Sequence, residues 1–261
     1  MTDLRSLLGV AGAALDQAST LVTDMAVGAV QAKGDRDMVS EIDFAVEEHV
    51  RTFLQKETPE IGFLGEESGG AGAGGALTWA LDPVDGTANL VNGIPLCGVS
   101  LGLIADNRSV LGVIDLPFLG QRYRAAEGHG AYCGDDRIWP RETTSLNEAI
   151  VAIGDYAVGE RAQERNARRL DLTARLAESV LRVRMFGSAA VDLVWVASGK
   201  IDCSIALSNH PWDMAAGAAI AREAGAVLMD VDGTPHDLTS AATIAVSSAL
   251  GDALLELLTG I

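Results

Sequence analysis

Hydrophobic residues near the N-terminus recur at intervals of three and four, which is the spacing of a helix with one buried face. The residues that share this face are Leu4, Leu7, Leu8, Ala11, Leu15, Ala18, Val22 and Met25. The same periodicity predicts a second helix over residues 42–57. Ser40 and Asp43 stand at its start in the S-x-x-D pattern of a capping box, which indicates where this helix begins.

Strand-like segments follow the two helices. Short apolar runs lie at 61–64 and 77–81, and the second of them ends at an Asp-Pro turn. Between them, the glycine-rich stretch 69–75 is expected to be a mobile loop. Residues 96–138 contain short alternating runs separated by turns, which predicts an antiparallel meander.

The pattern changes near Ser145, after which strand-like runs alternate with helical segments. The five strand-like runs are 149–153, 181–185, 201–207, 226–229 and 243–247. Alternation of this kind is typical of helices packed over a mixed or parallel sheet. No internal repeat or flexible linker separates the two parts, so we expect residues 1–145 and 146–261 to be two halves of one unit.

The chain is strongly acidic, with a formal net charge of −17 over 261 residues. This charge disfavours nucleic acid as a partner, because surfaces that bind nucleic acid are rich in Lys and Arg. An anionic ligand would need a divalent cation to attract it. Hydrophobic residues make up 48% of the chain, which argues against disorder. The three cysteines, Cys97, Cys133 and Cys203, are widely spaced, as expected of a reduced, cytoplasmic protein.

Two apolar stretches have lengths that suggest membrane insertion or export. Residues 86–105 contain no charged residue, but they include Asn89, Asn92 and Pro95, so we expect them in a folded core. Residues 7–15 resemble the apolar part of a signal peptide. Their helical periodicity continues past Asp16, so we interpret them as part of the first helix and expect no membrane association.

Acidic residues stand next to predicted strands and helices at three places: Glu66-Glu67, Asp82 with Asp85, and Asp213. Placing a carboxylate near a core costs free energy unless water solvates it or a cation neutralises its charge. Asp82 and Asp85 are three residues apart across a proline-containing turn, so both side chains can face one point. Oxygen ligands without a nearby His or Cys cluster favour Mg²⁺ over Zn²⁺.

The N–H groups of Gly86 and Thr87 follow this turn at a predicted helix start, where free N–H groups bind phosphate. Together with cations and the Thr87 hydroxyl, they indicate hydrolysis of a phosphoryl group. Each signal also has a structural interpretation. The Asp-Pro motif is common in turns, Asp213 suits the first turn of a helix, and Asp43 completes a capping box. The two glutamates fit a solvated sheet edge.

Three motifs carry this chemistry in order along the chain: Gly65-Glu66-Glu67-Ser68, Trp79-Ala80-Leu81-Asp82-Pro83-Val84-Asp85-Gly86-Thr87-Ala88-Asn89 and Trp212-Asp213-Met214-Ala215-Ala216-Gly217. Supporting segments are Ser40-Glu41-Ile42-Asp43, Gly187-Ser188-Ala189-Ala190 and Glu223-Ala224-Gly225-Ala226, followed by Asp230. In these motifs the sequence resembles the inositol monophosphatase family of Mg²⁺-dependent, lithium-sensitive phosphatases. The resemblance implies an α/β (α+β) fold: a layered αβαβα sandwich with an antiparallel N-terminal sheet and a smaller mixed C-terminal sheet. It also implies a homodimer.

The resemblance further implies a centre of two or three Mg²⁺ ions. Glu66, Asp82 and the Val84 carbonyl would hold the first ion, and Asp82, Asp85 and Asp213 would hold the second. A weaker third ion would lie near Glu66. The N-terminal half would thus carry most of the metal ligands and the phosphate loop, and the C-terminal half would complete the site.

In the implied mechanism, Thr87, Glu66 and Asp43 orient and help deprotonate a metal-activated water, which attacks phosphorus in line without a phosphoenzyme. The expected substrate contacts are Gly86, Thr87, Ala88, Gly187, Ser188, Ala189 and His210. The resemblance implies a small phosphorylated metabolite as substrate, with inositol-1-phosphate as the default. Histidinol phosphate, a sugar phosphate or another small phosphomonoester is the alternative, and a regulatory, protein-binding role is more remote.

Two residues depart from the pattern of members that hydrolyse inositol phosphate. Ala206 stands where those members have a glutamate that binds ring hydroxyls, and Leu90 stands where an aromatic residue is frequent. These departures leave the implied metal site intact, so they bear on the identity of the leaving alcohol.

Two other motifs indicate different chemistry. Gly98-Val99-Ser100-Leu101-Gly102 matches the G-x-S-x-G elbow of serine hydrolases. Apolar residues alternate straight through it, so we expect a buried strand instead of a nucleophile turn. Residues 70–75 match G-x-G-x-x-G, but no predicted strand precedes them and no predicted helix follows.

Overall fold

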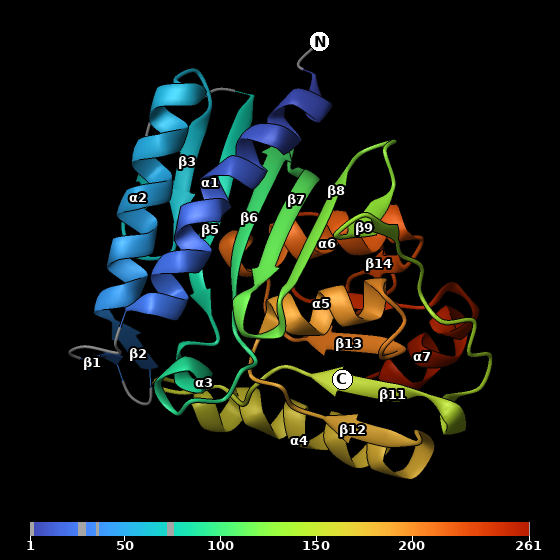
Figure 1. Ribbon diagram of the computed structural model, residues 1–261. Coiled ribbons are helices and arrows are strands. Elements are labelled where there is room, and N and C mark those ends of the chain that lie inside the picture. The colour runs from blue at the N-terminus through green and yellow to red at the C-terminus, as the bar shows by residue number, and fades with distance from the viewer. Residues whose placement is uncertain (1–2, 26–29, 35–36, 72–75, 261) are drawn as a thin grey trace.

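Helices and sheets alternate in five layers, in the order α, β, α, β, α (Figure 1). The computed structural model describes residues 3–25, 30–34, 37–71 and 76–260. The described helices are α1 (Leu4–Asp24), α2 (Glu41–Glu57), α3 (Thr87–Val91), α4 (Ala162–Ser179), α5 (Ala189–Ala197), α6 (Pro211–Ala224) and α7 (Gly251–Leu258). Helices α1 and α2 cover the outer face of an eight-stranded sheet, and α5 and α6 separate it from a five-stranded sheet. Helices α4 and α7 cover the far face of the second sheet.

The two predicted N-terminal helices are confirmed as α1 and α2. Ser40 and Asp43 form the expected capping box at the start of α2. None of the described helices is both long and apolar enough to cross a membrane.

The first sheet is antiparallel except for one parallel pair of strands. Its strands are β3 (Gly62–Gly65), β4 (Gly69–Ala71), β5 (Leu77–Asp85), β6 (Gly98–Ala105), β7 (Arg108–Leu116), β8 (Gln121–Ala126), β9 (Ala131–Cys133) and β10 (Asp136–Arg137). They lie in the order β10-β9-β8-β7-β6-β5-β3-β4. All neighbours are antiparallel except β3 and β5, so the expected antiparallel sheet is wrong at this pair. The reason is that β4 folds back along the outer edge of β3 and leaves the inner edge to β5.

The predicted meander is confirmed in strands β6 to β10. Its first turn, at Asp106 and Asn107, has positive φ angles of 47° and 62°, as two-residue hairpin turns require. The G-x-S-x-G segment lies inside β6 with Ser100 fully buried, so its interpretation as a strand is confirmed. Gly69–Ala71, expected in a loop, pairs with β3 as strand β4, and residues 72–75 lie outside the described residues.

The second sheet confirms the predicted mixed arrangement. Its strands are β11 (Ile150–Ile153), β12 (Arg182–Arg184), β13 (Cys203–Ala206), β14 (Val227–Met229) and β15 (Thr243–Val246). In the order β12-β11-β13-β15-β14, β11 is parallel to both neighbours and the other pairs are antiparallel. Each of the five predicted runs contains one of these strands. A separate antiparallel pair, β1 (Val30–Gly34) and β2 (Asp37–Ser40), precedes α2.

Helix α6 lies directly on the first sheet, and this contact positions its N-terminal end. A side-chain carbon at Gly112 of β7 would lie only 2.2 Å from the Ala216 carbonyl oxygen, so glycine is required there. On its other side α6 packs closely on α5, where Gly217 meets Leu193. Small residues on these surfaces hold α6 between sheet and helix, and with it Asp213 in its first turn.

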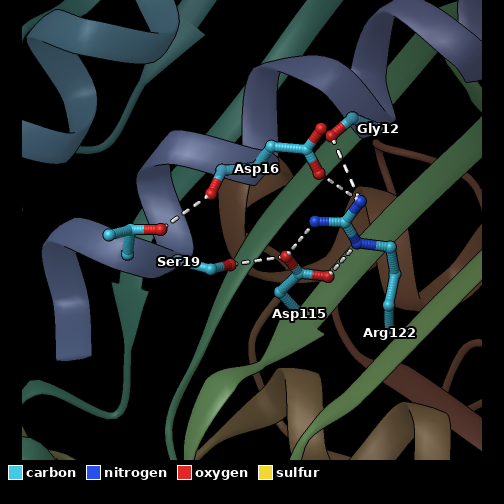
Figure 2. Close-up of polar contacts among 6 residues, drawn as sticks. Gly12, Asp16, Ser19, Asp115 and Arg122 are labelled. Atoms are coloured by element: carbon cyan, nitrogen blue, oxygen red, sulfur yellow. Dashed lines mark hydrogen bonds and ion pairs between the residues drawn. The ribbon is translucent and has the colours of Figure 1, made fainter.

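An ion pair between the partly buried Arg122 and the buried Asp115 ties α1 to strands β7 and β8 (Figure 2). Arg122 donates to both carboxylate oxygens of Asp115, which is 4% exposed, and to Asp16 of α1 at 2.7 Å. The Ser19 hydroxyl of α1 donates to the same Asp115 carboxylate. The hydrogen bonds to Asp115 and Asp16 raise the pKa of Arg122 above its ordinary value, against the opposing effect of burial.

Replacing Arg122 with methionine is expected to lower the free energy of unfolding by about 3 kcal/mol, because Asp115 would stay buried without its counter-ion. Urea unfolding followed by circular dichroism measures this loss. Arg124→Met is the matched control, because Arg124 makes a surface pair with the exposed Asp135 at 3.4 Å. In this control the free energy of unfolding is expected to fall by less than about 1 kcal/mol. Equal losses in the two variants would contradict the role assigned to the buried pair.

Candidate active site

The end of strand β5 carries two of the predicted acidic side chains. The sequence predicts an end at Leu81, but the strand runs on to Asp85, and its pairing with β6 is irregular between Asp82 and Asp85. Within this segment the Asp82 carboxylate accepts a hydrogen bond from the Val84 N–H at 3.0 Å. Asp82 and Asp85 are 3% and 8% exposed, so both carboxylates lie inside the molecule.

Three carboxylates from three elements converge at this end of the sheet. Glu66 follows β3, Asp82 lies in β5, and Asp213 lies in the first turn of α6. Strands β3 and β5 run parallel with Gly65 beside Leu81, and the Glu66 N–H donates to the Leu81 carbonyl oxygen at 3.1 Å. One oxygen of each carboxylate lies within 4.8 Å of the other two. The parallel strand pair and the position of α6 therefore bring these acids together.

The carboxylate cluster, Glu66 with Asp82 and Asp213, is electrostatically unfavourable by itself. Burial raises the pKa of Asp82 well above its ordinary value, and the charges of Glu66, Asp85 and Asp213 raise it further. Among the described residues, the groups that shift this pKa include no basic side chain. A divalent cation would remove the repulsion, and Mg²⁺ prefers oxygen ligands of this kind. The donor set therefore fits the Mg²⁺ that the family resemblance implies.

Asp85 lies beside the cluster and also caps helix α5. Its carboxylate accepts hydrogen bonds from the Ser188 hydroxyl at 3.1 Å, the Ala189 N–H at 3.2 Å and the Ala190 N–H. Burial raises the pKa of Asp85 to about 6, and these hydrogen bonds oppose the shift. Asp85 is not one of the three acids whose oxygens converge, but its charge acts on Asp82.

Thr87 connects the turn after β5 to helix α2. Its hydroxyl lies 3.0 Å from Asp43 Oδ1 and 3.0 Å from the Val84 carbonyl oxygen. Asp43 is fully buried, and its Oδ2 accepts hydrogen bonds from the Ser40 N–H and hydroxyl at 2.9 and 2.6 Å. One carboxylate thus caps α2 with one oxygen and orients the Thr87 hydroxyl with the other.

The turn that begins α3 packs against the segment before α5. Gly86 has a φ of 91°, which glycine adopts without strain. A side-chain carbon there would also lie 3.0 Å from the Leu96 carbonyl oxygen and 3.2 Å from that of Gly187. The Asn89 amide donates to the carbonyl oxygens of Leu96 and Phe186 at 2.7 Å each. The predicted phosphate contacts on these two segments are therefore held side by side.

Glu47 supports the site, although the sequence analysis does not identify it. It is 3% exposed on the buried face of α2, and its carboxylate accepts hydrogen bonds from the N–H groups of Glu67 and Ser68 at 2.9 and 2.8 Å. A side-chain carbon at Gly65 would overlap this carboxylate, 2.4 Å from Glu47 Oε2. Glu47 thus fixes the segment that leads into the carboxylate cluster. The signal in the sequence is its place on the apolar face of the helix, four residues after Asp43.

A pocket of about 220 Å³ opens beside the carboxylate cluster. The predicted contacts Gly187, Ser188 and Ala189 line it together with Asp85 and Asp213. Asp85 of the first half of the chain and the predicted residues Gly187, Ser188, Ala189 and Asp213 of the second half therefore share one opening.

Four predicted substrate contacts are not among the described residues that line this pocket: Gly86, Thr87, Ala88 and His210. Ala88 is exposed on α3. His210 is exposed just before α6, and its ring stacks on Trp212 with centroids 5.3 Å apart. A larger cavity of about 710 Å³ lies between α1 and strands β8 and β9, and none of the predicted site residues lines it. Contact of Gly86, Thr87, Ala88 and His210 with substrate stays a prediction.

Converging carboxylates beside a pocket, with a threonine hydroxyl and backbone donors on the adjoining turn, are typical of enzymes that hydrolyse phosphate esters. The chain belongs to the inositol monophosphatase family, whose model matches residues 3–260. It is therefore a phosphatase, a hydrolase of phosphoric monoesters.

Individual relatives agree with this assignment. The chain is similar to inositol-1-monophosphatase ImpA of Mycolicibacterium smegmatis, at 35% identity over 256 residues, which cover 97% of this chain and 92% of that protein. A protein of Aquifex aeolicus named fructose-1,6-bisphosphatase/inositol-1-monophosphatase is 35% identical over 227 residues, covering 87% of this chain and 84% of that protein. The structure of extragenic suppressor protein suhB from Bartonella henselae superposes with a TM-score of 0.89 at 30% identity, covering 98% of this chain and 100% of that chain.

Proposed function

We propose that this protein is a Mg²⁺-dependent phosphatase that hydrolyses a small phosphorylated metabolite, with inositol-1-phosphate as the default substrate. The observation that carries the proposal is the convergence of Glu66, Asp82 and Asp213 beside a pocket, in a member of this family. The names of relatives support an inositol monophosphate, and one relative is also named as a fructose-1,6-bisphosphatase.

Glu66, Asp82 and the Val84 carbonyl would hold one Mg²⁺, Asp82, Asp85 and Asp213 a second, and a weaker third ion would lie near Glu66. When bound, Mg²⁺ neutralises charge on the phosphoryl oxygens and lowers the pKa of the attacking water. The charges of Glu66, Asp85 and Asp213 act against the buried charge of Asp82, and this repulsion supports the assignment, since cations would relieve it. In this proposal residues 1–145 supply most ligands and the phosphate loop, and residues 146–261 complete the site.

The chain's own residues would orient the attacking water and the phosphate. The Thr87 hydroxyl can donate its proton to Asp43 Oδ1, which leaves the Thr87 oxygen able to accept a hydrogen bond from water. Glu66 would help to remove the water's proton. The N–H groups of Gly86 and Thr87, at the start of α3, would bind phosphoryl oxygens. Water would attack phosphorus in line, with no phosphoenzyme, and the alcohol would leave into the pocket lined by Ser188.

Phosphate release tests the proposal directly. Purified protein would be assayed with inositol-1-phosphate, histidinol phosphate, sugar phosphates and nucleotide monophosphates, after removal of metal with EDTA and again after addition of Mg²⁺. We expect at least one small phosphomonoester to be hydrolysed with Mg²⁺, and the rate to fall by about 10²-fold or more on chelation. Activity that survives chelation but is lost in Ser100→Ala would contradict the proposal in favour of a serine hydrolase.

Lithium provides a second readout in the same assay. A monovalent cation competes weakly for hard oxygen ligands, so we expect inhibition at concentrations on the order of tens of millimolar. Sodium chloride at the same concentration controls for ionic strength. Equal effects of the two salts would contradict specific binding of lithium at the carboxylate cluster.

We also propose a homodimer in the cytoplasm. The family resemblance supports the homodimer, and free cysteines are compatible with a reducing compartment. Burial raises the pKa of the Cys97 thiol to about 12, which keeps this thiol unreactive. Light scattering after size exclusion would test the assembly, with twice the chain mass of 27.1 kDa as the expected result.

A further inference from the structure

The pocket of about 220 Å³ beside the carboxylate cluster is lined by acidic residues to which the proposed chemistry assigns no role. Asp85 and Asp213, two of the proposed metal ligands, line it, and so do Asp155, just after β11, and Asp192, in α5, which are not among the proposed ligands. Ser204 of β13 lies on the same lining. The volume of about 220 Å³ is below that of sites for drug-sized ligands, so a small leaving alcohol fits.

Asp192 is buried without a partner for one of its oxygens. It is 4% exposed, and its Oδ1 has no hydrogen-bond partner among the described residues. Burial raises the pKa of Asp192 well above its ordinary value, and the charges of Asp85 and Asp155 raise it further. Buried polar atoms in folded proteins nearly always have partners, so an exception requires an explanation. A hydrogen-bond donor in the pocket would supply the missing partner.

Asp155, unlike Asp192, is exposed to solvent. The preceding Gly154 packs beside Ala206, since a side-chain carbon at Gly154 would lie 3.7 Å from Ala206 Cβ. Strand β13 therefore contributes only a methyl group here, and the charge comes from Asp155. The described residues that line the pocket include no Lys, Arg or His. A second phosphate on the leaving group would meet the negative charge of Asp155 without a compensating basic side chain, even when metal ions neutralise the carboxylate cluster.

We propose that this pocket selects phosphomonoesters whose leaving alcohol carries hydrogen-bond donors and no second anionic group, and that Asp155 makes this selection. The inference rests on the proposed phosphatase function and adds a substrate class to it. The donors are neutral hydroxyls or an ammonium group, because carboxylate oxygens accept hydrogen bonds from both. An ammonium group is expected to bind more tightly than a hydroxyl, since its hydrogen bond to a carboxylate is also an ion pair.

Four substrates separate these possibilities in the wild-type protein and in Asp155→Asn. In the bound ester, the nitrophenyl group of p-nitrophenyl phosphate has neither hydrogen-bond donors nor a net charge. The alcohol part of inositol-1-phosphate has hydroxyls, and that of histidinol phosphate has an ammonium group. Fructose-1,6-bisphosphate carries a second phosphate. For Asp155→Asn we expect kcat/KM to fall about tenfold for histidinol phosphate and about threefold for inositol-1-phosphate, through KM and not kcat. We expect a rise of about threefold for fructose-1,6-bisphosphate and no change for p-nitrophenyl phosphate.

Glu160→Gln is the matched control, because Glu160 is an exposed acid of the same segment that does not line the pocket. This substitution is expected to leave kcat/KM unchanged for all four substrates. Three results would overturn this inference while the phosphatase function stands: equal changes for all substrates, no change for any, or turnover of p-nitrophenyl phosphate or the bisphosphate in preference to both donor-bearing substrates. Absence of phosphate release from all four with Mg²⁺ would overturn the inference and the proposed function together.

Discussion

Replacing Asp82 with asparagine is expected to lower Mg²⁺-dependent phosphate release by about 10²–10³-fold, the scale of losing one electrostatic contact with a transition state. Asparagine keeps the shape of the side chain and the oxygen that accepts the Val84 N–H. It loses the charge that would bind the cation. Phosphate release at saturating Mg²⁺ measures the effect.

The same substitution is expected to raise the melting temperature of the metal-free protein. Asp82 is buried beside Glu66, Asp85 and Asp213, so removal of its charge relieves repulsion in the folded state. Added Mg²⁺ should raise the melting temperature of the wild type but not that of the variant, because only the wild type would bind the ion tightly. A variant that is less stable without metal would contradict this interpretation, since it would identify Asp82 as a structural acid.

Asp202→Asn is the matched control for this experiment. Asp202 is also fully buried, but its carboxylate accepts hydrogen bonds from the Thr143 hydroxyl at 2.6 Å and the Ile150 N–H at 2.8 Å. Its replacement is expected to lower the melting temperature and to leave turnover per folded molecule unchanged, because these contacts lie outside the carboxylate cluster. The two buried aspartates should therefore respond in opposite directions.

Replacing Thr87 with alanine is expected to lower kcat by about 10²-fold or more, the scale of losing a group that handles the proton of the attacking water. The hydroxyl would be lost while Asp43 keeps its hydrogen bonds to Ser40, so α2 should stay capped. The stabilisation of the protein by Mg²⁺ should also be retained, because the carboxylate cluster is intact. Single-turnover phosphate release and thermal unfolding with Mg²⁺ measure the two quantities separately.

Thr87→Ser controls for this role, because serine keeps the hydroxyl that donates to Asp43 Oδ1. Turnover in this variant is expected to stay within about threefold of the wild type. If serine and alanine were equally damaging, the methyl group and not the hydroxyl would matter, and the role proposed for Thr87 would be wrong.

The local pattern of hydrophobic residues predicts those helices and strands that bury one face or that consist of a continuous apolar run. Helices α1 and α2 have apolar residues at helical spacing because one side of each packs on the first sheet. The parallel pairing of β3 with β5 is set instead by which edge of β3 the strand β4 takes, and periodicity does not encode that choice. Gly69–Ala71 has no large apolar residue to mark it as a strand, and pairing with β3 makes it one.

The acids of the site differ in how far sequence alone can identify them. Asp82 and Asp213 stand in motifs whose order and spacing along the chain are informative by themselves. Glu47 and Asp192 lie on buried faces of helices, where each interrupts an apolar pattern. The partners of Glu47 are N–H groups some twenty residues away, at Glu67 and Ser68, so only the folded chain reveals its role.

One measurement tests most directly whether Glu66, Asp82 and Asp213 hold divalent cations beside the pocket. Crystals of the full chain grown with Mn²⁺ in place of Mg²⁺ would locate the ion by its anomalous scattering, independently of any activity. We expect a strong peak among these three carboxylates, and no peak there in Asp82→Asn crystals grown in the same way. A peak elsewhere in the wild type, or three carboxylates that point apart with no peak between them, would contradict the proposed metal centre.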